Sequence, residues 1–260
     1  MNYGLYLSAS GVLANLYRQD VFANNLANVE TAGFRPDVPM IRQRDAEVVE
    51  DELGHDVSQH LLDRLGGGVL AGPQYVSSGA GPLHQTGNPL DVALQDKSSF
   101  FAVQKFDEQS GRVAVCLTRD GRFTLDSEGR LVTQSGHAVL GPGDEPISIP
   151  RGVEVKIDQA GRIQSLDGAM IGRLQVATVE DGSVLRKQGQ NLLSFEGHDP
   201  RTFQSDSLLK PGYIETSGVD PIKSVLQLTA ATKAAMGNAK MIQYFDLLMD
   251  RSVNTFGRIA

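Results

Sequence analysis

The residues best suited to hold a metal ion are five histidines and one cysteine, but their spacing argues against a site. The histidines are at positions 55, 60, 84, 137 and 198. Only His55 and His60 lie close together, and a spacing of five does not place both on one face of a helix. Cys116 lies in the apolar segment 113–117, where a buried, inert thiol is the expected state. With a single cysteine, no intramolecular disulfide and no cysteine-based zinc site can form, and we predict no metal site.

Acidic side chains are numerous enough to supply the paired carboxylates of a glycosidase, but each candidate lies beside a predicted turn. The candidates are Asp107, Asp120, Asp126, Asp158 and Asp167. Aspartate is favoured in turns because its side chain accepts hydrogen bonds from the local backbone. No serine lies in a glycine-x-serine-x-glycine elbow, and the spacing gives Cys116 no histidine partner. Glycines 66–68 precede no lysine–serine or lysine–threonine pair, so they indicate a flexible linker instead of a phosphate-binding loop. We therefore predict that the chain is not an enzyme and binds no cofactor.

The composition is that of a folded protein and excludes several partners. The chain has 260 residues, of which 40% are hydrophobic and 21% charged, enough for one large or two smaller domains. The net charge of -7 and the absence of a basic stripe argue against nucleic acid as a partner. Residues 1–7 lack the features of a cleaved signal peptide, and no apolar stretch approaches the roughly 18 residues that span a bilayer. We predict no transmembrane segment.

Apolar residues at spacings of three and four predict a long helix near the start of the chain, from about residue 2 to residue 28. The spacing is similar to that of a coiled coil, and the helix would be about 40 Å long. It should end in the asparagine-rich run before Gly33, because asparagine and glycine tolerate the left-handed conformation that closes helices. The stripe residues, which we expect to pack against other helices, are Leu5, Ala9, Val12, Leu16, Ala23 and Leu26.

A second long helix is predicted from about Val219, with Pro221 in its first turn and no later proline. Alanines and Gly237 make one side of this helix thin, so that a neighbouring backbone could approach closely. Gly237 costs about 1 kcal/mol relative to alanine in an exposed helix, which a tightly packed partner would offset. The residues expected to pack against other helices are Leu228, Ala235, Ala239, Ile242 and Met249.

Between the helices, regularly recurring glycines separate short β-prone segments, which is typical of an all-β domain. Asp120-Gly121 and Asp167-Gly168 are expected to be hairpin turns. An extended, partly flexible connector is expected before this domain, and a short helix around Val57 to Leu65 is one interpretation of its sequence. The predicted domains are a helix and turn at 1–35, the connector at 36–83, a β-rich domain at 84–215 and a helix at 216–260.

The run 24–28, Asn-Asn-Leu-Ala-Asn, followed by Thr31, Gly33, Phe34 and Arg35, resembles the motif that opens the flagellar axial proteins, the family of rod, hook and hook-associated subunits. The resemblance to flagellar rod proteins continues through residues 87–94, 100–103, 118–125 and 129–133. The chain departs from the family at 96–99, where a shorter glycine-containing turn is usual, and at 235–236, where an aromatic residue and a glutamate are usual. Residues 36–83 show no such resemblance.

The resemblance implies a mainly β fold, with a central all-β domain flanked by N- and C-terminal helices that pair like a coiled coil on assembly. It implies a structural subunit of the bacterial flagellar basal-body rod, proximal or distal, in a hollow helical axle that transmits torque and passes exported subunits. The implied partners are copies of the chain, other rod and hook axial proteins and the flagellar type III export apparatus, which needs no cleaved signal peptide. The implied location is the periplasm-spanning rod. The residues expected to shape the turn after the first helix are Asn24, Asn25, Asn28, Gly33 and Phe34.

Two alternatives remain beside a rod subunit. A hook or hook-cap subunit would share the terminal motifs but usually has a larger central region, so the chain length favours the rod. A protein of another class, a β-rich glycan-binding module or hydrolase, would carry the helical ends incidentally. The terminal stripes could also pack as an antiparallel hairpin on the chain's own β-domain and contribute only to the core of a monomer. We expect instead that they become fully ordered on assembly, because a few apolar contacts must offset the backbone entropy of a long helix.

Overall fold

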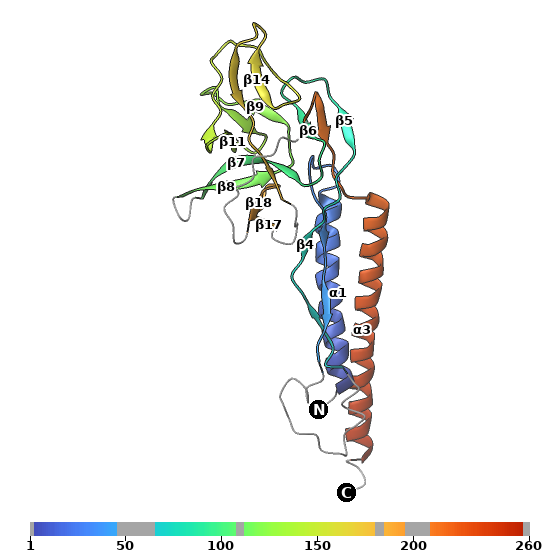
Figure 1. Cartoon of the computed structure of the whole chain (residues 1–260). Helices are drawn as coiled ribbons and strands as arrows, with labels where there is room; N and C mark the ends of the chain where they lie inside the picture. The colour runs from blue at the N-terminus through green and yellow to red at the C-terminus, as the bar shows by residue number, and fades with distance from the viewer. Residues whose placement is uncertain (1–2, 46–65, 108–111, 180–184, 196–208, 257–260) are drawn as a thin grey trace. The chain divides into compact units, whose positions relative to one another are not determined.

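The computed structural model describes residues 3–45, 66–107, 112–179, 185–195 and 209–256 (Figure 1). The chain forms two compact units. The first contains Met1–Leu26, Asp37–Gln74 and Pro221–Ala260, and the second contains Ala27–Pro36 and Tyr75–Asp220. His55, His60 and His198 lie outside the described residues, as does the helix considered around Val57 to Leu65.

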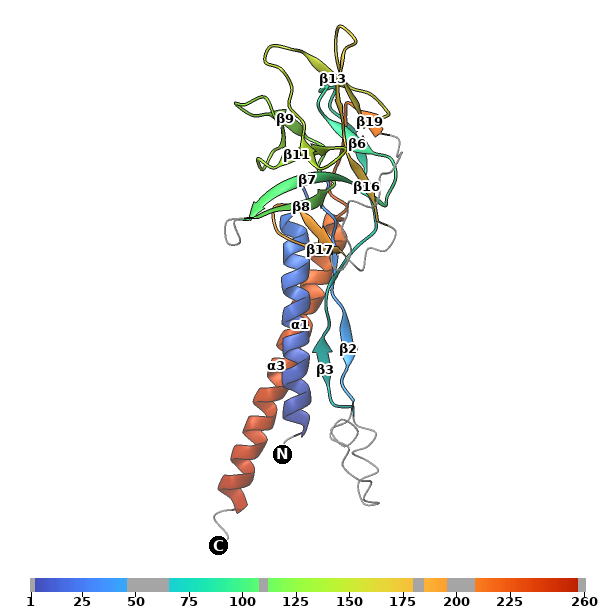
Figure 2. The same ribbon diagram turned by 60° about the vertical axis from the view of Figure 1, so that its left-hand side comes forward.

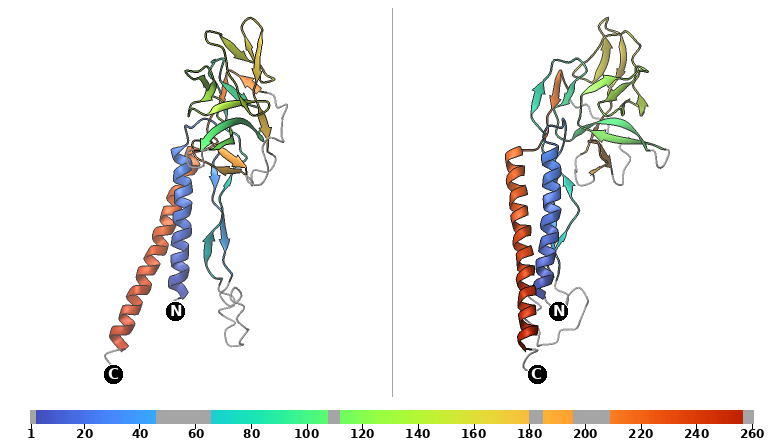
Figure 3. Two further views of the ribbon diagram at one scale, coloured as in Figure 1. Left: turned by 90° about the vertical axis from the view of Figure 1, so that its left-hand side faces the viewer. Right: turned by 180° about the vertical axis from the view of Figure 1, so that it is seen from behind.

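The first unit is built on two long helices. Helix α1 spans Tyr3–Ala27 with 25 residues, and helix α3 spans Pro221–Phe256 with 36 residues. They lie side by side in all the views (Figures 1 and 3). Helix α1 ends inside the asparagine-rich run and α3 begins at Pro221, so both predicted helices are confirmed. Neither of these described helices is long and apolar enough to cross a membrane.

A narrow antiparallel ribbon completes the first unit and lies along α1 (Figure 2). Its strands are β2, Ile41–Gln43, and β3, Val69–Ala71, and the short β1, Asp37–Val38, precedes them. Tyr17 of α1 donates its hydroxyl hydrogen bond to the Gly72 carbonyl at 3.1 Å. The Gly67 N–H donates to the Arg44 carbonyl at 2.9 Å, and the Arg44 N–H donates to the Gly68 carbonyl at 3.0 Å. Gly67 and Gly68 of the glycine run are therefore hydrogen-bonded to the strand segment around Arg44.

The second unit is built from β-sheets. Its largest sheet has nine strands, with the central order β17-β18-β8-β7-β11-β10-β9, while β16 also pairs with β7 and β12 with β11. The strands of this sheet are β7 (Ser99–Asp107), β8 (Arg112–Thr118), β9 (Phe123–Leu125), β10 (Leu131–Thr133), β11 (Ala138–Gly141), β12 (Glu145–Pro146), β16 (Val176–Thr178), β17 (Leu185–Lys187) and β18 (Leu193–Phe195). All these pairings are antiparallel.

Smaller sheets complete the second unit. The strands β13 (Val155–Ile157), β14 (Arg162–Ser165) and β15 (Met170–Arg173) form a three-stranded sheet. The strand β6 (Val92–Leu94) pairs with β19 (Leu209–Pro211), and β5 (Leu83–Gln85) pairs with β20 (Tyr213–Glu215). The remaining strand is β4 (Tyr75–Val76). The predicted mainly β fold with a helix at each end is confirmed.

Alternation along β7 and β8 divides the core of the second unit into two clusters. Phe101 and Cys116 belong to the larger cluster, whereas their sequence neighbours Phe100 and Leu117 belong to the smaller one. Successive side chains of a strand point to opposite faces of a sheet, so this sheet carries apolar contacts on both faces. Cys116 is buried, and burial raises the pKa of its thiol, as expected for an inert core cysteine.

One of the two predicted hairpin turns is correct. Gly168, with φ 85°, lies in the turn between β14 and β15, which pair with each other. Gly121 does not form a hairpin, because β8 pairs with β7 and β18 whereas β9 pairs with β10. The segment around Gly121 instead runs against β6, where the Val92 N–H donates to the Gly121 carbonyl at 3.0 Å. A Cβ at Gly121 would come within 1.7 Å of the Val92 oxygen, so glycine is needed for close approach.

Candidate functional site: the motif turn and the helix pair

The motif turn, residues 28–35, is held by hydrogen bonds to distant parts of the second unit. The Gly33 N–H donates to the Glu215 carbonyl at 2.8 Å, and the Gly218 N–H donates to the Phe34 carbonyl at 2.9 Å. The Asn191 side chain donates to the Ala32 carbonyl at 2.8 Å. Phe34 is buried. The motif is therefore anchored by its backbone, and its exact path is fixed by the fold.

Gly33 needs to be glycine for two reasons. Its φ of 67° lies in the left-handed region, and a Cβ would come within 2.5 Å of the Arg119 carbonyl carbon. An alanine at this position would therefore be strained in its backbone conformation, and its Cβ would also clash with the Arg119 backbone. Gly136 has the same kind of backbone conformation, with φ 84°, but an added Cβ there would have no atom within 4 Å.

Gly33→Ala is therefore expected to lower the free energy of unfolding of the second unit by about 2–4 kcal/mol, combining left-handed strain with a forced backbone shift. Gly136→Ala, the matched control, is expected to cost only about 1–2 kcal/mol. Urea unfolding, monitored through hydrogen exchange of the β7 and β8 amides, measures the loss of free energy in both variants. Equal losses in the two variants would contradict the role given to the Arg119 backbone.

Three buried charged side chains lie next to the motif turn. Arg35, Arg119 and Glu215 form this buried charge cluster, and each is 2% exposed. The Arg119 Nε donates to Glu215 Oε2 at 2.8 Å, and the Arg35 Nε lies 3.9 Å from Glu215 Oε1. The Gly81 N–H also donates to Glu215 Oε1 at 3.0 Å. One carboxylate thus joins two guanidinium groups and a backbone amide that are far apart in the sequence.

The two arginines also donate to backbone carbonyls and lie near one aromatic ring. Arg35 donates to the Lys97 carbonyl at 2.6 Å, and Arg119 donates to the Asp96 carbonyl at 2.7 Å. The Cζ atoms of both arginines lie 5.7 Å from the centroid of the Phe100 ring. Segment 96–99, where the sequence departs from the family, therefore supplies carbonyl acceptors to the buried charge cluster.

Burial lowers the pKa of both arginines, but they stay charged at neutral pH. The pKa of Arg35 falls to about 10, mainly because burial removes water and secondarily because Arg119 lies nearby, while Glu215 acts in the opposite direction. Burial also lowers the pKa of Arg119, and Glu215 again opposes the shift. Glu215 is therefore the main favourable charge for two guanidinium groups that have lost their hydration.

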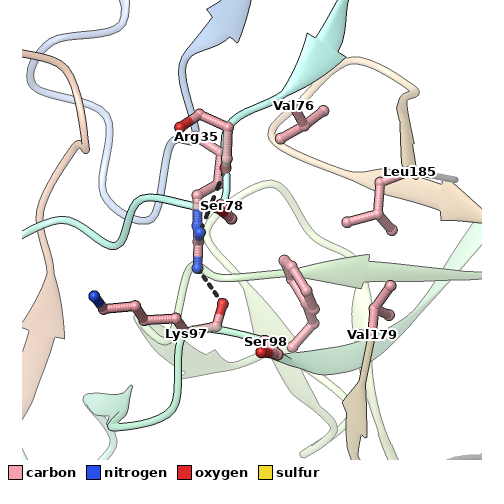
Figure 4. Close-up of a pocket in the computed structure, with 9 residues that line it drawn as sticks. Arg35, Val76, Ser78, Lys97, Ser98, Val179 and Leu185 are labelled. Atoms are coloured by element: carbon pink, nitrogen blue, oxygen red, sulfur yellow. Dashed lines mark hydrogen bonds between the residues drawn. The ribbon is translucent and has the colours of Figure 1, made fainter. Parts of the chain in front are cut away.

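A small hollow beside Arg35 is too small for a substrate or cofactor. Figure 4 shows Arg35 reaching towards the Lys97 carbonyl, with Val76, Val179 and Leu185 on the opposite side. Its volume is about 30 Å³, the room taken by about two water molecules. Ligand pockets are usually at least about 300 Å³. The arrangement supports a structural role for Arg35.

Two of the aspartates considered for catalysis serve turns, as predicted. Asp126 Oδ1 accepts from the N–H groups of Glu128 at 2.9 Å and Arg130 at 2.8 Å, and its Oδ2 accepts from Arg130 Nε at 2.8 Å. Asp158 repeats the arrangement with Ala160 at 2.9 Å and Arg162 at 2.8 and 2.7 Å. The hydrogen bond from Arg130 is the main reason why the pKa of Asp126 is lowered. Among the described residues, no group of three or more histidine, cysteine, aspartate or glutamate side chains could hold a metal ion.

In the first unit, Asn25 fixes the chain where it returns after the motif turn. Its Nδ2 donates to the Asp37 carbonyl at 2.8 Å, and the Asp37 N–H donates to Asn25 Oδ1 at 2.8 Å. Asn24 donates to Asp37 Oδ2 at 3.3 Å. In the second unit, Thr31 donates to the Asn28 Oδ1 at 3.2 Å. The structure thus gives each motif asparagine a side-chain hydrogen bond.

Helices α1 and α3 pack antiparallel through small residues. A Cβ on Gly4 would come within 2.5 Å of the Phe245 ring, and a Cβ on Gly11 within 2.5 Å of the Asn238 amide. A step of seven residues forward in α1 therefore matches seven residues backward in α3, which is the heptad spacing of a coiled coil. The residues buried along the two helices are Ala14, Val21, Asn25, Ser224, Ala231 and Ala235. We call this contact the internal seam.

The predicted packing residues are divided between the internal seam and the outer surface. Ala235 is 8% exposed and lies on the side of α3 that faces the seam. Leu5 and Leu16 are 37% and 44% exposed, and Met249 is 51% exposed. Ala23 is exposed, and the partly exposed members are Ala9, Val12, Leu26, Leu228, Ala239 and Ile242. In the free chain, the large residues of the α1 stripe are therefore left outside the internal seam.

The sequence did not indicate the seam glycines or the partner of Arg35. The apolar stripe of α1 led to Leu5 and Leu16, while Gly4 and Gly11 carry no hydrophobic signal. Glu215 lies in an ordinary short strand, far in sequence from Arg35 and Arg119. A glutamate that falls on a buried strand position is the only signal that could have pointed to it.

Comparison with known proteins decides the family. The family model described as "Flagella basal body rod protein" matches residues 5–35, and the one described as "Flagellar hook protein FlgE/F/G D1 domain" matches residues 97–165. The flagellar basal-body rod protein FlgF of Caulobacter vibrioides is 30% identical, with 100% of both chains covered. The chain belongs to the flagellar basal-body rod protein family. FlgF of Escherichia coli is 30% identical with 95% of each chain covered, and FlgG of Caulobacter vibrioides is 30% identical with 94% of this chain and 96% of the relative covered.

Membership of the rod protein family confirms that the chain is a structural protein of the bacterial flagellum and not an enzyme. The alternative of a glycan-binding module or hydrolase is thereby set aside. The rod protein motif at residues 5–35 includes Arg35, and the D1 match includes Arg119, whereas Glu215 lies outside both matched segments.

Proposed function

We propose that the chain is a subunit of the flagellar rod that polymerises through α1 and α3 into a hollow helical axle. The axle would carry torque and pass subunits that are exported later. Its partners would be copies of the chain and other rod and hook axial proteins, with delivery by the flagellar type III export apparatus. The names of the relatives support the rod more than the hook.

The exposed apolar surface of the two helices carries this proposal. Large exposed side chains occur on several sides of α3, and their exposed fractions are high. Those on α3 are Ile222, Val225, Leu226, Met236, Met241, Tyr244, Leu247, Leu248, Met249 and Val253. Helix α1 adds Leu5, Tyr6, Leu13 and Leu16. An exposed apolar surface of this extent is normally covered by partners, which a tube of packed helices would provide.

The internal seam supports the proposal that the helices gain order on assembly. Glycine and alanine dominate the seam, so pairing of α1 with α3 buries little apolar area in one chain. Amides of residues 5–26 are therefore expected to exchange faster than amides of β7 in the free subunit and to become protected in the rod. Hydrogen exchange on a proven monomer measures this. Strong protection of residues 5–26 in that monomer would contradict it.

Electron microscopy of basal bodies tests the proposed function directly. A strain that lacks the chain is expected to build basal bodies with a truncated rod and no hook. Expression of the wild-type chain from a plasmid should restore the complete rod. Rods of normal length in the deletion strain would overturn the proposal.

A further inference from the structure

The internal seam specifies the pairing register of α1 and α3 only weakly. Gly11 faces Asn238, and the next positions in the same register, Ala14 and Ala235, are both buried. A slip of one heptad would bring Gly11 opposite Ala231, so that small residues would meet again. Side chains of this size bury little apolar area, so the slipped pairing would lose few contacts. The register therefore needs another part of the chain to fix it.

The chain segments that leave α1 and enter α3 are bonded to each other. Helix α1 ends at Ala27 and α3 begins at Pro221, at the same end of the helix pair (Figures 1 and 3). Two backbone hydrogen bonds, of 2.8 and 2.9 Å, join residues 33–35 after α1 to residues 215–218 before α3. We call these two bonded segments the clasp.

Buried charge holds the two segments of the clasp together. The Glu215 carboxylate lies 3.9 Å from the Arg35 Nε, so this ion pair connects one clasp segment to the other. The Arg119 Nε donates to the same carboxylate at 2.8 Å, which attaches the clasp to the chain that follows β8. All three side chains are buried, so removal of the carboxylate would leave two charged arginines without water or a counter-charge. The clasp therefore depends on Glu215.

The connectors between the clasp and the helices have little slack. On the α1 side, the Asn191 side chain donates to the Ala32 carbonyl at 2.8 Å. On the α3 side, the Val219 N–H donates to the Ser217 hydroxyl at 3.3 Å, and Val219 is buried. A slip of one heptad would shift one helix by about 10 Å along the other. Connectors this short and this closely bonded oppose such a shift.

We infer that the clasp sets the register in which α1 pairs with α3 of the same chain, and that Glu215 is its positioning residue. The clasp acts at one end of the helix pair, and each helix carries the register along its length. The heights of the apolar side chains of α1 relative to those of α3 are thereby fixed. This register belongs to a single chain, so it goes beyond the proposed function and can be measured on the free subunit.

Intramolecular disulfide trapping in the full-length monomer measures the register. In a Cys116→Ala background, Ala14→Cys with Ala235→Cys reports the register of the structure. Ala14→Cys with Leu228→Cys, or with Ile242→Cys, reports a slip of one heptad in either direction. A disulfide needs Cα atoms closer than about 7 Å, and a heptad step along a helix exceeds this distance. With the clasp intact, only the pair with Ala235→Cys is expected to form the bond.

Two variants release the clasp in different ways. Glu215→Gln removes the charge but keeps the side-chain shape, and the slipped disulfides are expected to rise to yields similar to that of the in-register one. Insertion of Gly-Ser-Gly-Ser between the exposed Asp220 and Pro221 leaves every bond of the clasp in place. It adds about 13 Å of chain, which is more than one heptad step. The same rise is expected, so the test does not depend on the folding of Glu215→Gln.

Leu131→Ala is the matched control for a loss of stability. It opens a cavity in the larger core cluster of the second unit and removes no bond of the clasp. The in-register disulfide should remain the only one in this variant. Slipped disulfides at the yield of Glu215→Gln would show that a loss of stability alone is enough, and would overturn the inference.

The linker variant decides whether the seam or the clasp sets the register. Absence of slipped disulfides from this variant would overturn the inference, because the seam would then set its own register. A rise in the linker variant without a rise in Glu215→Gln would overturn the role of Glu215. None of these results bears on the proposed function, which fails only if the wild-type chain is absent from purified rods.

Discussion

Replacement of Glu215 by alanine is expected to lower the free energy of unfolding of the second unit by about 3–5 kcal/mol. The variant leaves Arg35 and Arg119 buried at 2% exposure without their shared carboxylate. The Gly81 N–H loses its acceptor at the same time. Urea unfolding monitored by hydrogen exchange in β7, β8 and β20 measures the loss.

Two further variants separate the loss of charge from the loss of side-chain volume. Glu215→Gln keeps the shape and an acceptor oxygen but removes the negative charge, so it should remain strongly destabilising. Glu154→Ala changes an exposed glutamate of the same unit and is expected to stay within about 0.5 kcal/mol of wild type. A loss below about 1 kcal/mol for Glu215→Ala would show that water or a neighbouring group replaces the carboxylate.

The buried charge cluster links three segments that sequence patterns treat as separate. Arg35 closes the motif turn after α1, Arg119 follows β8, and Glu215 ends β20 shortly before α3. Spacing patterns find residues that share one helix or one strand, so they predicted the two long helices and the β-domain. They contain no information on a carboxylate contributed by a distant strand, because the sheet topology alone brings it to the arginines.

The helix contacts, too, could be predicted only in part from the spacing of apolar residues. The three- and four-residue spacing correctly predicted α1 and α3 because local periodicity sets the helical face. It selected Leu5 and Leu16 as contacts, but the internal seam is made at Gly4 and Gly11. Two backbones can approach closely only where side chains are small, so the seam within one chain has no strong hydrophobic signal. The large residues remain available to other helices.

The Asp120-Gly121 error has a physical origin of the same kind. An aspartate–glycine pair is favoured in hairpins because both residues tolerate unusual backbone angles. At position 121 a glycine is required for a different reason: β6 lies so close that there is no room for a side chain. A local sequence does not distinguish a glycine that turns the chain from a glycine that admits a neighbouring strand.

Leu16→Asp is expected to abolish incorporation of the chain into the rod, and with it motility, while both units stay folded. Leu16 is 44% exposed, so a carboxylate there costs little in the free subunit. In a rod it would be buried in an apolar helix contact, which costs several kcal/mol in every copy. Ile242→Asp should also abolish incorporation, although Ile242 is partly buried and the free helix pair would be weakened as well. Swimming in soft agar and immunoblots of purified basal bodies measure the effect.

Comparison with a leucine of similar exposure decides whether the loss of motility is caused by the helix surface. Leu125 of β9 is 38% exposed and lies in the second unit, so Leu125→Asp should leave motility close to wild type. Leu16→Met should also swim, because it keeps an apolar side chain of similar volume. Wild-type motility in both Leu16→Asp and Ile242→Asp would refute a rod held together by these helices. Loss of motility in Leu125→Asp alone would place the main contact between copies on the β-domain, since the two leucines differ in location far more than in exposure.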